Sequence, residues 1–306
     1  MKFNSIFDQP AATGRRPVAG AGAGDFRSGA KYLCTPAMDL AVSAASATQR
    51  PLLVTGPAGC GKSSLARSTA ARLSWRYLER TVNSRTEINS LLWDVDQLGR
   101  LQDAHLGKLK DDLLGYVRPS VLWQALDART AADPLLLRQP APARLAPANP
   151  AVVLIDEIDK ADPDLPNNLL EVLGGLRFEV ADTGCRVTCS SGVPLIVITS
   201  NDERDLPPAF VRRCIVLTLQ QPDLAKVAAL HFPKDGKLVA DALRLLVGDA
   251  NTTANTPAST AITTPPSAAE FLDFIQACKT LKVRAGADAW LALAEACVLK
   301  GRAGTA

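Results

Sequence analysis

The chain contains the stretch PLLVTGPAGCGKS at residues 51–63. The first five of these residues are mostly apolar and are followed by Gly56, a pattern that predicts a short buried strand. Residues 62–73 have the periodicity of a helix. A strand, a glycine-rich turn and a helix in this order predict the beginning of an α/β domain.

The turn in this stretch fits the pattern G-x-x-x-x-G-K-S, which is typical of phosphate binding. Its glycines let successive backbone N–H groups converge on phosphate oxygens, and the start of the helix adds a favourable field. Lys62 would reach the β and γ phosphates of a nucleotide, and the Ser63 hydroxyl would bind Mg²⁺. The residues expected to bind the nucleotide are Gly56, Pro57, Ala58, Gly59, Cys60, Gly61, Lys62, Ser63 and Ser64. The alternative is a glycine-rich turn without a ligand, and Cys60 is interpreted as a tolerated small residue rather than a redox switch.

A second buried strand is expected at 152–155, and it is followed directly by Asp156 and Glu157. Ligands of open parallel sheets bind at the carboxyl ends of the strands, so both carboxylates would lie beside the phosphate loop. Asp156 suits the Mg²⁺ shell, and Glu157 can orient and deprotonate an attacking water. The alternative is an acidic helix start, in which Asp156 or Asp159 serves as the cap.

Two further segments place polar groups near expected strands. An apolar run at 195–199 leads to Asn201, whose amide could hold the lytic water or sense the γ-phosphate, although such an Asn is often only a turn residue. Arg212 and Arg213 end a short expected helix before a strand at 214–219. They could stabilise the end of their own helix, or they could reach the nucleotide of a neighbouring subunit and stabilise the transferring phosphoryl group.

The composition limits the classes of partner. The chain has 34 Lys and Arg against 31 Asp and Glu, a formal net charge of +3, which gives no reason to expect nucleic acid or an anionic membrane. No apolar stretch is long enough to cross a bilayer and the first residues form no secretory signal, so we expect a cytoplasmic protein. The seven Cys are scattered and only two His are present, which argues against a disulfide framework or a zinc site.

The remaining patterns predict a large α/β domain followed by a smaller helical one. Outside the strands already described, we expect a helix at 35–47 capped by Thr35, a strand at 77–82, helices at 87–92 and 99–114, and a loop at 128–150. After residue 220 the helical patterns lie at 222–231, 236–247, 268–282 and 287–299. The expected parts are a flexible tail at 1–31, a nucleotide-binding domain at 32–220, and a helical domain at 221–306 with a disordered loop at 251–267.

Taken together, these segments resemble the AAA+ ATPases and, within them, the MoxR-like group. The resemblance covers roughly residues 32–219 and continues more weakly to the C-terminus. The matching motifs are GPAGCGKS at 56–63 for Walker A, VVLIDEIDKAD at 152–162 for Walker B, ITSN at 198–201 for sensor 1, and LPPAFVRRC at 206–214 for the arginine finger. The segment Val283-Arg284-Ala285 is similar to the sensor 2 position, which would make Arg284 a contact to the γ-phosphate.

The resemblance implies a P-loop NTPase with an αβα core, a parallel five-stranded sheet and a small all-helical lid domain, with ATP and Mg²⁺ bound at their junction. It also implies a homo-oligomeric ring, a hexamer, in which residues 178–189 form a hairpin that faces the pore. An ordinary surface hairpin is the alternative for that segment. The implied activity is chaperone-like: ATP hydrolysis drives lid motion, which remodels or matures a client or adaptor protein.

Other functions remain open from the sequence. A nucleotide-gated switch in a signalling or defence assembly, with slow turnover, would use the same motifs. A P-loop kinase for a small molecule would need an acceptor pocket and a base, and the Arg212-Arg213 pair favours assembly instead. A nucleic-acid motor would carry a basic stripe with interleaved aromatic residues, which the sequence lacks.

Overall fold

The core of the protein is a parallel five-stranded sheet with the strand order β2-β5-β8-β1-β9. The computed structural model describes residues 5–8, 31–140, 150–181, 183–247 and 266–298. The strands of this sheet are β1 (Leu52–Thr55), β2 (Arg76–Thr81), β5 (Ala151–Asp156), β8 (Leu195–Thr199) and β9 (Ile215–Thr218). Each begins and ends within one residue of the strand expected from the sequence, and the predicted αβα fold class is confirmed.

Helices cover both faces of the sheet because alternate strand residues point to opposite sides. Leu52, Val54 and Leu154 pack with helices α1 (Pro36–Thr48) and α2 (Lys62–Leu73). Their neighbours along the strands, such as Leu53 and Val153, belong to a second cluster with α5 (Val121–Leu126) and α7 (Asp164–Gly175). The sheet is therefore buried on both faces, which explains its nearly continuous apolar strands.

The predicted start of α1 is confirmed. The Thr35 hydroxyl accepts a hydrogen bond from the N–H of Met38, and Pro36 is the first helical residue. Its end at Thr48 is one residue beyond the expected end, where Gln49 takes the left-handed conformation. A capping side chain at one end and a left-handed residue at the other are sufficient to delimit the helix.

The predicted helix at 99–114 is wrong in its second half. Helix α4 (Gln97–His105) begins earlier, because Asp96 accepts a hydrogen bond from the N–H of Gly99 at 3.0 Å. Past the end of α4, Gly107 has a φ of +64°, which turns the chain away from the helix path. The next helical turn is the 3₁₀ helix Leu113–Tyr116.

The predicted loop at 128–150 also needs correction. It contains α6 (Ala128–Ala132) and the 3₁₀ helix Pro134–Arg138. The carboxylates of Asp127 and Asp133 accept hydrogen bonds from the N–H groups of the first turns, so they start both helices. Composition alone indicated a loop because Pro and Ala dominate, whereas two capping residues determine the structure. Residues 141–149 lie outside the described part of the chain.

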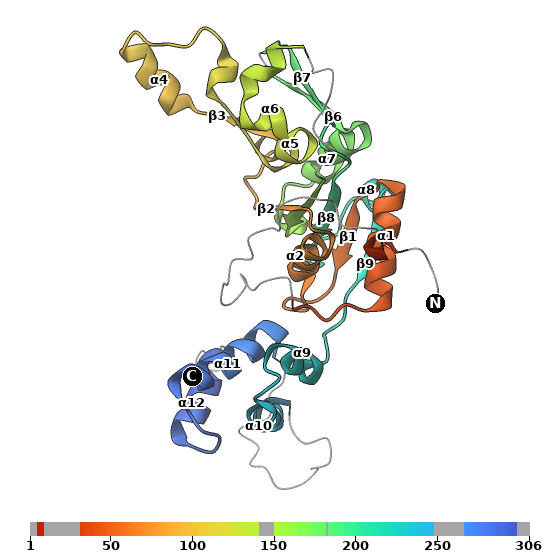
Figure 1. Ribbon diagram of the computed structural model, residues 1–306, viewed down its shortest axis with the longest axis vertical. Helices are drawn as coiled ribbons and strands as arrows, with labels where there is room; N and C mark the ends of the chain where they lie inside the picture. The colour runs from red at the N-terminus through yellow and green to blue at the C-terminus, as the bar shows by residue number, and fades with distance from the viewer. Residues whose placement is uncertain (1–4, 9–30, 141–149, 182, 248–265, 299–306) are drawn as a thin grey trace.

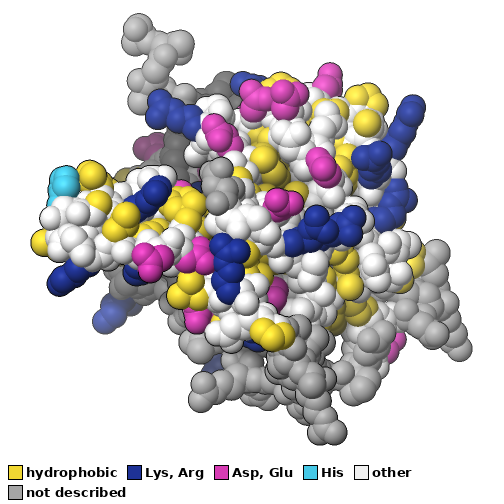
Figure 2. Space-filling view, turned by 90° about the horizontal axis from the view of Figure 1, so that it is seen from above, with side chains coloured by type: hydrophobic (Ala, Val, Ile, Leu, Met, Phe, Trp, Pro, Cys, Tyr) yellow, Lys and Arg dark blue, Asp and Glu magenta, His cyan; other side chains and the backbone are white. Residues whose placement is uncertain are grey.

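The segment between β2 and β5 extends away from the sheet (Figure 1). Besides α4, α5 and α6, it contains α3 (Ile88–Leu92) and a ribbon of β3 (Trp93–Val95) with β4 (Val117–Pro119). No residue of α4 is buried, and its Leu98 and Leu101 are 75% and 55% exposed. Seen from this end, basic and acidic side chains are interspersed rather than separated (Figure 2), in keeping with the near-balanced charge.

A hairpin forms where the sequence places one, at 178–189. Its antiparallel strands are β6 (Arg177–Val180) and β7 (Cys185–Thr188), with Phe178, Val180, Cys185 and Val187 facing the core. Phe178 stacks on Trp93 with ring centroids 5.5 Å apart and meets the edge of Trp123 at 5.7 Å. These ring contacts anchor the hairpin to the segment between β2 and β5. Residue 182 is not described.

Four helices form a separate group below the sheet in Figure 1. They are α9 (Leu224–His231), α10 (Gly236–Val247), α11 (Ala268–Leu281) and α12 (Asp288–Cys297). Phe271, Phe274 and Trp290 form the centre of their own hydrophobic cluster. The predicted helical region after the sheet is confirmed, and residues 248–265, which contain most of the expected polar loop, are not described.

Part of the expected flexible tail is packed instead. Ile6–Asp8 form a 3₁₀ turn in which Ile6 is 8% exposed and its N–H donates to the Ser43 hydroxyl of α1. The Arg72 guanidinium lies 3.6 Å from the centroid of the Phe7 ring and bonds the Asp39 carboxylate at 2.6 Å. Apolar burial and a cation–π contact therefore fix residues 5–8 on α1 and α2, whereas residues 9–30 are not described.

We expect Asp39→Asn to lower the free energy of unfolding at pH 7 by about 0.5–1 kcal/mol, because the pair with Arg72 is partly exposed. The hydrogen bond from Arg72 lowers the pKa of the Asp39 carboxyl. A lowered pKa stabilises the fold above the pKa of the unfolded chain, about 3.9, and this gain is lost as pH falls through the folded value. Urea unfolding between about pH 7 and 2.5 should show wild type and variant converging in acid. The exposed Asp205→Asn is the matched control, and a difference that did not change with pH would contradict this account.

Candidate functional site

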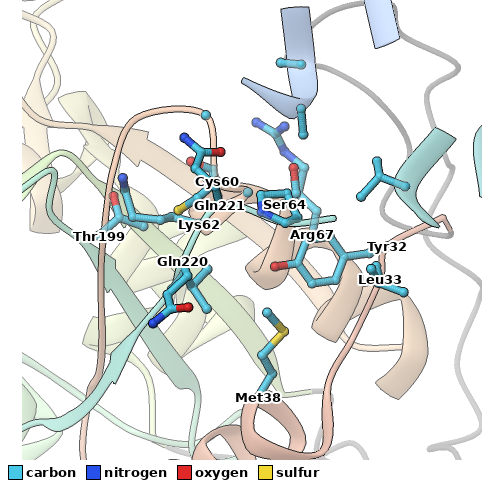
Figure 3. A pocket seen from close by; sticks show the side chains of 18 of the residues that line it. Tyr32, Leu33, Met38, Cys60, Lys62, Ser64, Arg67, Thr199, Gln220 and Gln221 are labelled. Atoms are coloured by element: carbon cyan, nitrogen blue, oxygen red, sulfur yellow. The ribbon is translucent and has the colours of Figure 1, made fainter. Parts of the chain in front are cut away.

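A cavity of about 970 Å³ opens at the carboxyl edge of the sheet, between the sheet and the helical group. It is lined by the glycine loop after β1, by residues that end β5 and β8, and by Leu230 and Leu272 of α9 and α11. Lys62 and Thr199 lie on one side of it, and Tyr32 and Leu33 on the other (Figure 3). This is where ligands of open parallel sheets bind.

The structure brings most of the predicted site residues together around this cavity. Those that line it are Ala58, Gly59, Cys60, Gly61, Lys62, Ser63, Ser64, Asp156, Glu157 and Asn201. Gly56 and Pro57 are the base of the loop, where their carbonyl oxygens accept hydrogen bonds from Lys62. The two motifs, 93 residues apart in sequence at Ser63 and Asp156, thus meet at one place.

The glycine loop is shaped to hold an anion. Gly59 and Gly61 have φ values of +74° and +97°, which side-chain-bearing residues rarely adopt. Gly61 is the N-cap of α2 and has no side chain to accept hydrogen bonds from the first N–H groups of that helix, and N–H groups of this kind bind anions. Lys62 is 7% exposed, and its Nζ donates to the Gly56 and Pro57 oxygens at 2.6 and 3.0 Å. An ammonium group has three donors, so one remains for a phosphate oxygen.

Ser63 and Asp156 supply oxygen atoms of the type that Mg²⁺ prefers. The Ser63 hydroxyl donates to the Asp156 carboxylate, with its Oγ 2.9 and 3.0 Å from Oδ1 and Oδ2. Within the described residues, no group of three or more His, Cys, Asp or Glu side chains could hold a metal. A hydroxyl and one carboxylate fit an ion that keeps waters and phosphate oxygens among its ligands.

Glu157 has an unusual backbone conformation. Its φ of +63° and ψ of +48° are left-handed, which costs a residue other than glycine of order 1 kcal/mol. Its N–H donates to the Thr199 hydroxyl at 2.9 Å, and its carboxylate bonds Lys160 at 3.0 Å. The hydrogen bond and charge of Glu157 raise the pKa of Lys160. The alternative of an acidic helix start capped by Asp156 or Asp159 is wrong in its cap: the turn that follows is a short 3₁₀ helix, Ile158–Lys160, whose N-cap is Glu157 without a side-chain capping hydrogen bond.

Asn201 lies beside these carboxylates, in the turn after β8. Its N–H and that of Glu203 both donate to Oδ2 of Asp159 at 3.1 Å. Asp159 is 3% exposed, and its Oδ1 is one of the few buried side-chain atoms of the described residues without a hydrogen-bond partner. A buried carboxylate therefore fixes the backbone of the turn that carries the Asn201 amide.

Three predicted arginines lie away from the cavity. Arg212 and Arg213 follow α8 (Pro208–Val211), both are exposed, and their carbonyl oxygens accept hydrogen bonds from Arg50. Arg284 is exposed as well and follows the end of α11, whereas the start of α11 lines the cavity. The structure does not bring Arg284 to the phosphate loop.

Sequence reasoning missed several residues of the site. Tyr32, Leu33 and Met38 form an apolar side of the cavity, but they lie in a segment without any motif. Burial raises the pKa of the Tyr32 hydroxyl, so the ring stays neutral. Thr199 was expected only as part of a strand, although its place beside Asn201 at the strand end could have marked it. Burial likewise raises the pKa of the Cys60 thiol, in agreement with a packing role.

The helical group touches the phosphate loop directly. A Cβ atom added to Gly59 would lie 2.2 Å from Cβ of Ser267. Ser267 is the N-cap of α11, and its hydroxyl accepts the N–H of Glu270. Gly59 therefore has no room for a side chain, independently of its φ.

Comparison with known proteins gives a family match. The model of the AAA domain (dynein-related subfamily) matches residues 51–214, which is more than half of the chain. No curated protein matches. Among solved structures, the chain is similar to NtrX from Brucella abortus in complex with ATP, at 16% identity and a TM-score of 0.46, covering 86% of this chain and 55% of NtrX. A RuvB mutant from Thermotoga maritima gives 14% identity and a TM-score of 0.44, covering 85% of this chain and 68% of RuvB.

The chain thus spans about half the length of NtrX, as it also does for the ADP complex of that protein, of which it covers 52%.

No helix in the described residues is long and apolar enough to span a membrane.

We expect Lys62→Ala to weaken binding of Mg²⁺-ATP at least about 100-fold, because it removes charge-assisted hydrogen bonds to phosphate. Isothermal titration calorimetry measures the dissociation constant. Lys234→Ala, which changes an exposed lysine of the helical region, is the control and should bind as the wild type does. Micromolar binding by the Lys62 variant would refute the role of the loop.

Proposed function

The chain belongs to the dynein-related subfamily of AAA domains, a family of ATPases, and we propose from that premise that it hydrolyses ATP with Mg²⁺ at the cavity described above. The contact between Ser63 and Asp156, beside Lys62, carries this proposal. It brings together a hydroxyl, a carboxylate and a buried ammonium group, which are the types of group that bind a triphosphate and its metal ion. The cavity is large enough for a nucleotide, at about 970 Å³.

Each residue of the cavity has a proposed task. The loop from Gly56 to Ser64 binds the phosphates, and the apolar side of the cavity at Tyr32 and Met38 binds the adenine ring of the nucleotide. Ser63 and Asp156 hold Mg²⁺, which when bound neutralises charge on the phosphate oxygens. Glu157 orients the water and accepts its proton.

Asn201 is proposed to hydrogen-bond the γ-phosphate or the attacking water. Its backbone N–H is bound by the buried Asp159, and Asn201 lines the same cavity as Glu157. The amide nitrogen lies 3.5 Å from Oε1 of Glu203, a long contact that it can exchange for a phosphate oxygen.

We further propose that the protein acts as a homo-oligomeric ring, a hexamer of the MoxR-like type. Arg212 and Arg213 are exposed and do not line the cavity of their own subunit, which suits a contact to the nucleotide of a neighbour. In this proposal residues 32–220 bind the nucleotide, residues 221–306 move as a lid, and the hairpin β6–β7 faces the pore of the ring in which a client protein is remodelled. Arg284 could sense the γ-phosphate only after a rearrangement of the lid.

A nucleotide-gated switch with slow turnover is a second candidate function. The observation that favours it is the ion pair between Lys160 and Glu157, because a carboxylate held by an ammonium group is a weaker base. A mass measurement with and without ATP, together with the turnover number, separates the two. Ring formation with steady turnover supports the remodelling ATPase, whereas slow turnover supports the switch.

We expect Glu157→Gln to bind Mg²⁺-ATP as the wild type does and to hydrolyse it at least about 100-fold more slowly, since the amide cannot accept the proton. Phosphate release under saturating ATP measures the rate. Glu171→Gln, on an exposed position of α7, is the matched control. An unchanged rate in the Glu157 variant would remove this residue from the chemistry.

Mixing variants tests the contact between subunits. We expect Arg213→Ala alone and Glu157→Gln alone to be inactive, and their mixture to regain part of the activity, because some interfaces then combine an intact Arg213 with an intact Glu157. Arg244→Ala on α10, whose side chain is 66% exposed, is the control and should stay active by itself. No recovery despite proven co-assembly would count against the role of Arg213, and the same experiment with Arg212→Ala decides between the two arginines.

A further inference from the structure

Thr199 is the last residue of β8, and its hydroxyl lies between the Asp156 carboxylate and the backbone N–H of Glu157 at the end of the neighbouring strand. It is 0% exposed. Its hydroxyl donates to Oδ1 of Asp156 at 2.5 Å and accepts the N–H of Glu157 at 2.9 Å. A hydroxyl has one donor and can accept, so a single side chain holds both residues at once.

The N–H that Thr199 accepts belongs to the residue with left-handed backbone. Glu157 has a φ of +63°, a conformation that persists in a residue other than glycine only when its surroundings hold it. The direction of the Glu157 side chain follows from this backbone conformation. The Thr199 hydroxyl is the partner of the N–H at that position, so it is placed to maintain that direction.

Asp156 has a second hydrogen-bond partner, whereas within the described residues the Glu157 N–H bonds Thr199 alone; the Glu157 carboxylate bonds Lys160. Asp156 also accepts the Ser63 hydroxyl at both of its oxygens, so it retains a hydrogen bond when Thr199 is changed. Loss of the Thr199 hydroxyl would therefore affect Glu157 more than the Ser63–Asp156 pair. A change at Thr199 should thus affect hydrolysis, which uses Glu157, more than nucleotide binding, which uses the Ser63–Asp156 pair.

We propose that Thr199 is a positioning residue for hydrolysis, whose hydroxyl holds the Glu157 carboxylate in its working direction. The inference rests on the proposed function, in which Glu157 is the base. Thr199 acts through Glu157 and Asp156 and makes no contact with the reacting atoms in this account. Displacement of a catalytic group by about 1 Å can reduce a rate about 100-fold, so one buried hydroxyl can control turnover.

The test compares three variants at position 199. Thr199→Val keeps the size of the buried side chain and removes the hydroxyl. Thr199→Ser keeps the hydroxyl. Thr199→Ala differs from Thr199→Ser only in lacking the hydroxyl. Turnover number, KM and the midpoint of thermal unfolding are measured for each, in the full chain with Mg²⁺-ATP.

We expect Thr199→Val and Thr199→Ala to lower kcat about 10- to 100-fold with KM changed less than about 3-fold, and Thr199→Ser to retain most of kcat. If Thr199→Val does not fold, Thr199→Ser and Thr199→Ala give the same comparison. A purely structural role predicts instead that kcat follows the loss of thermal stability, with Thr199→Ser and Thr199→Ala alike. Equal kcat for Thr199→Ser and Thr199→Ala, or wild-type kcat for Thr199→Val, overturns the inference.

Glu157→Gln separates this inference from the proposed function. Added to Glu157→Gln, the change Thr199→Val should not lower the residual rate further, because the group that it positions is already lost. Full activity in Glu157→Gln alone would reject the proposed base and the inference with it. An inactive Glu157→Gln together with a fully active Thr199→Val rejects the inference alone.

Discussion

The Asp156 carboxylate accepts hydrogen bonds from two hydroxyls, those of Ser63 and Thr199, and so joins three chain segments at the carboxyl edge of the sheet. These segments are the phosphate loop after β1, the acidic turn after β5 and the end of β8. Their strands are neighbours, in the order β5-β8-β1, so the sheet brings the segments close and Asp156 fixes their side chains. The proposed metal site includes this carboxylate, and the Thr199 hydroxyl that it accepts also binds the N–H of Glu157.

The strands and the phosphate loop could be predicted because their signals are local. Buried parallel strands are continuous apolar runs, and the loop has a fixed spacing of glycine, lysine and serine. The helix expected at 99–114 could not be delimited, because its boundaries depend on the Asp96 side chain and on the φ of Gly107. The strand order could not be predicted from local patterns either, since it depends on pairing between strands that are far apart in the sequence, such as β1 with β8.

The site was predictable to the extent that its residues belong to motifs. Lys62, Asp156 and Asn201 line one cavity as the motifs indicate. Tyr32 reaches it from a segment without periodicity, and Arg284 does not reach it although its local sequence resembles a known motif. Both depend on how separate elements pack together, which a short pattern does not contain.

The contact between Gly59 and Ser267 joins the phosphate loop to the start of α11. Helix α11 has 14 residues and is therefore about 21 Å long, with one end on the phosphate loop. Because no side chain separates loop and helix, a substitution that added a side chain at Gly59 would force this end of α11 away from the loop. A tilt of about 10° would then displace the far end of the helix by about 4 Å, given that length, so one added methyl group at the loop would change packing at the opposite end of the helical group.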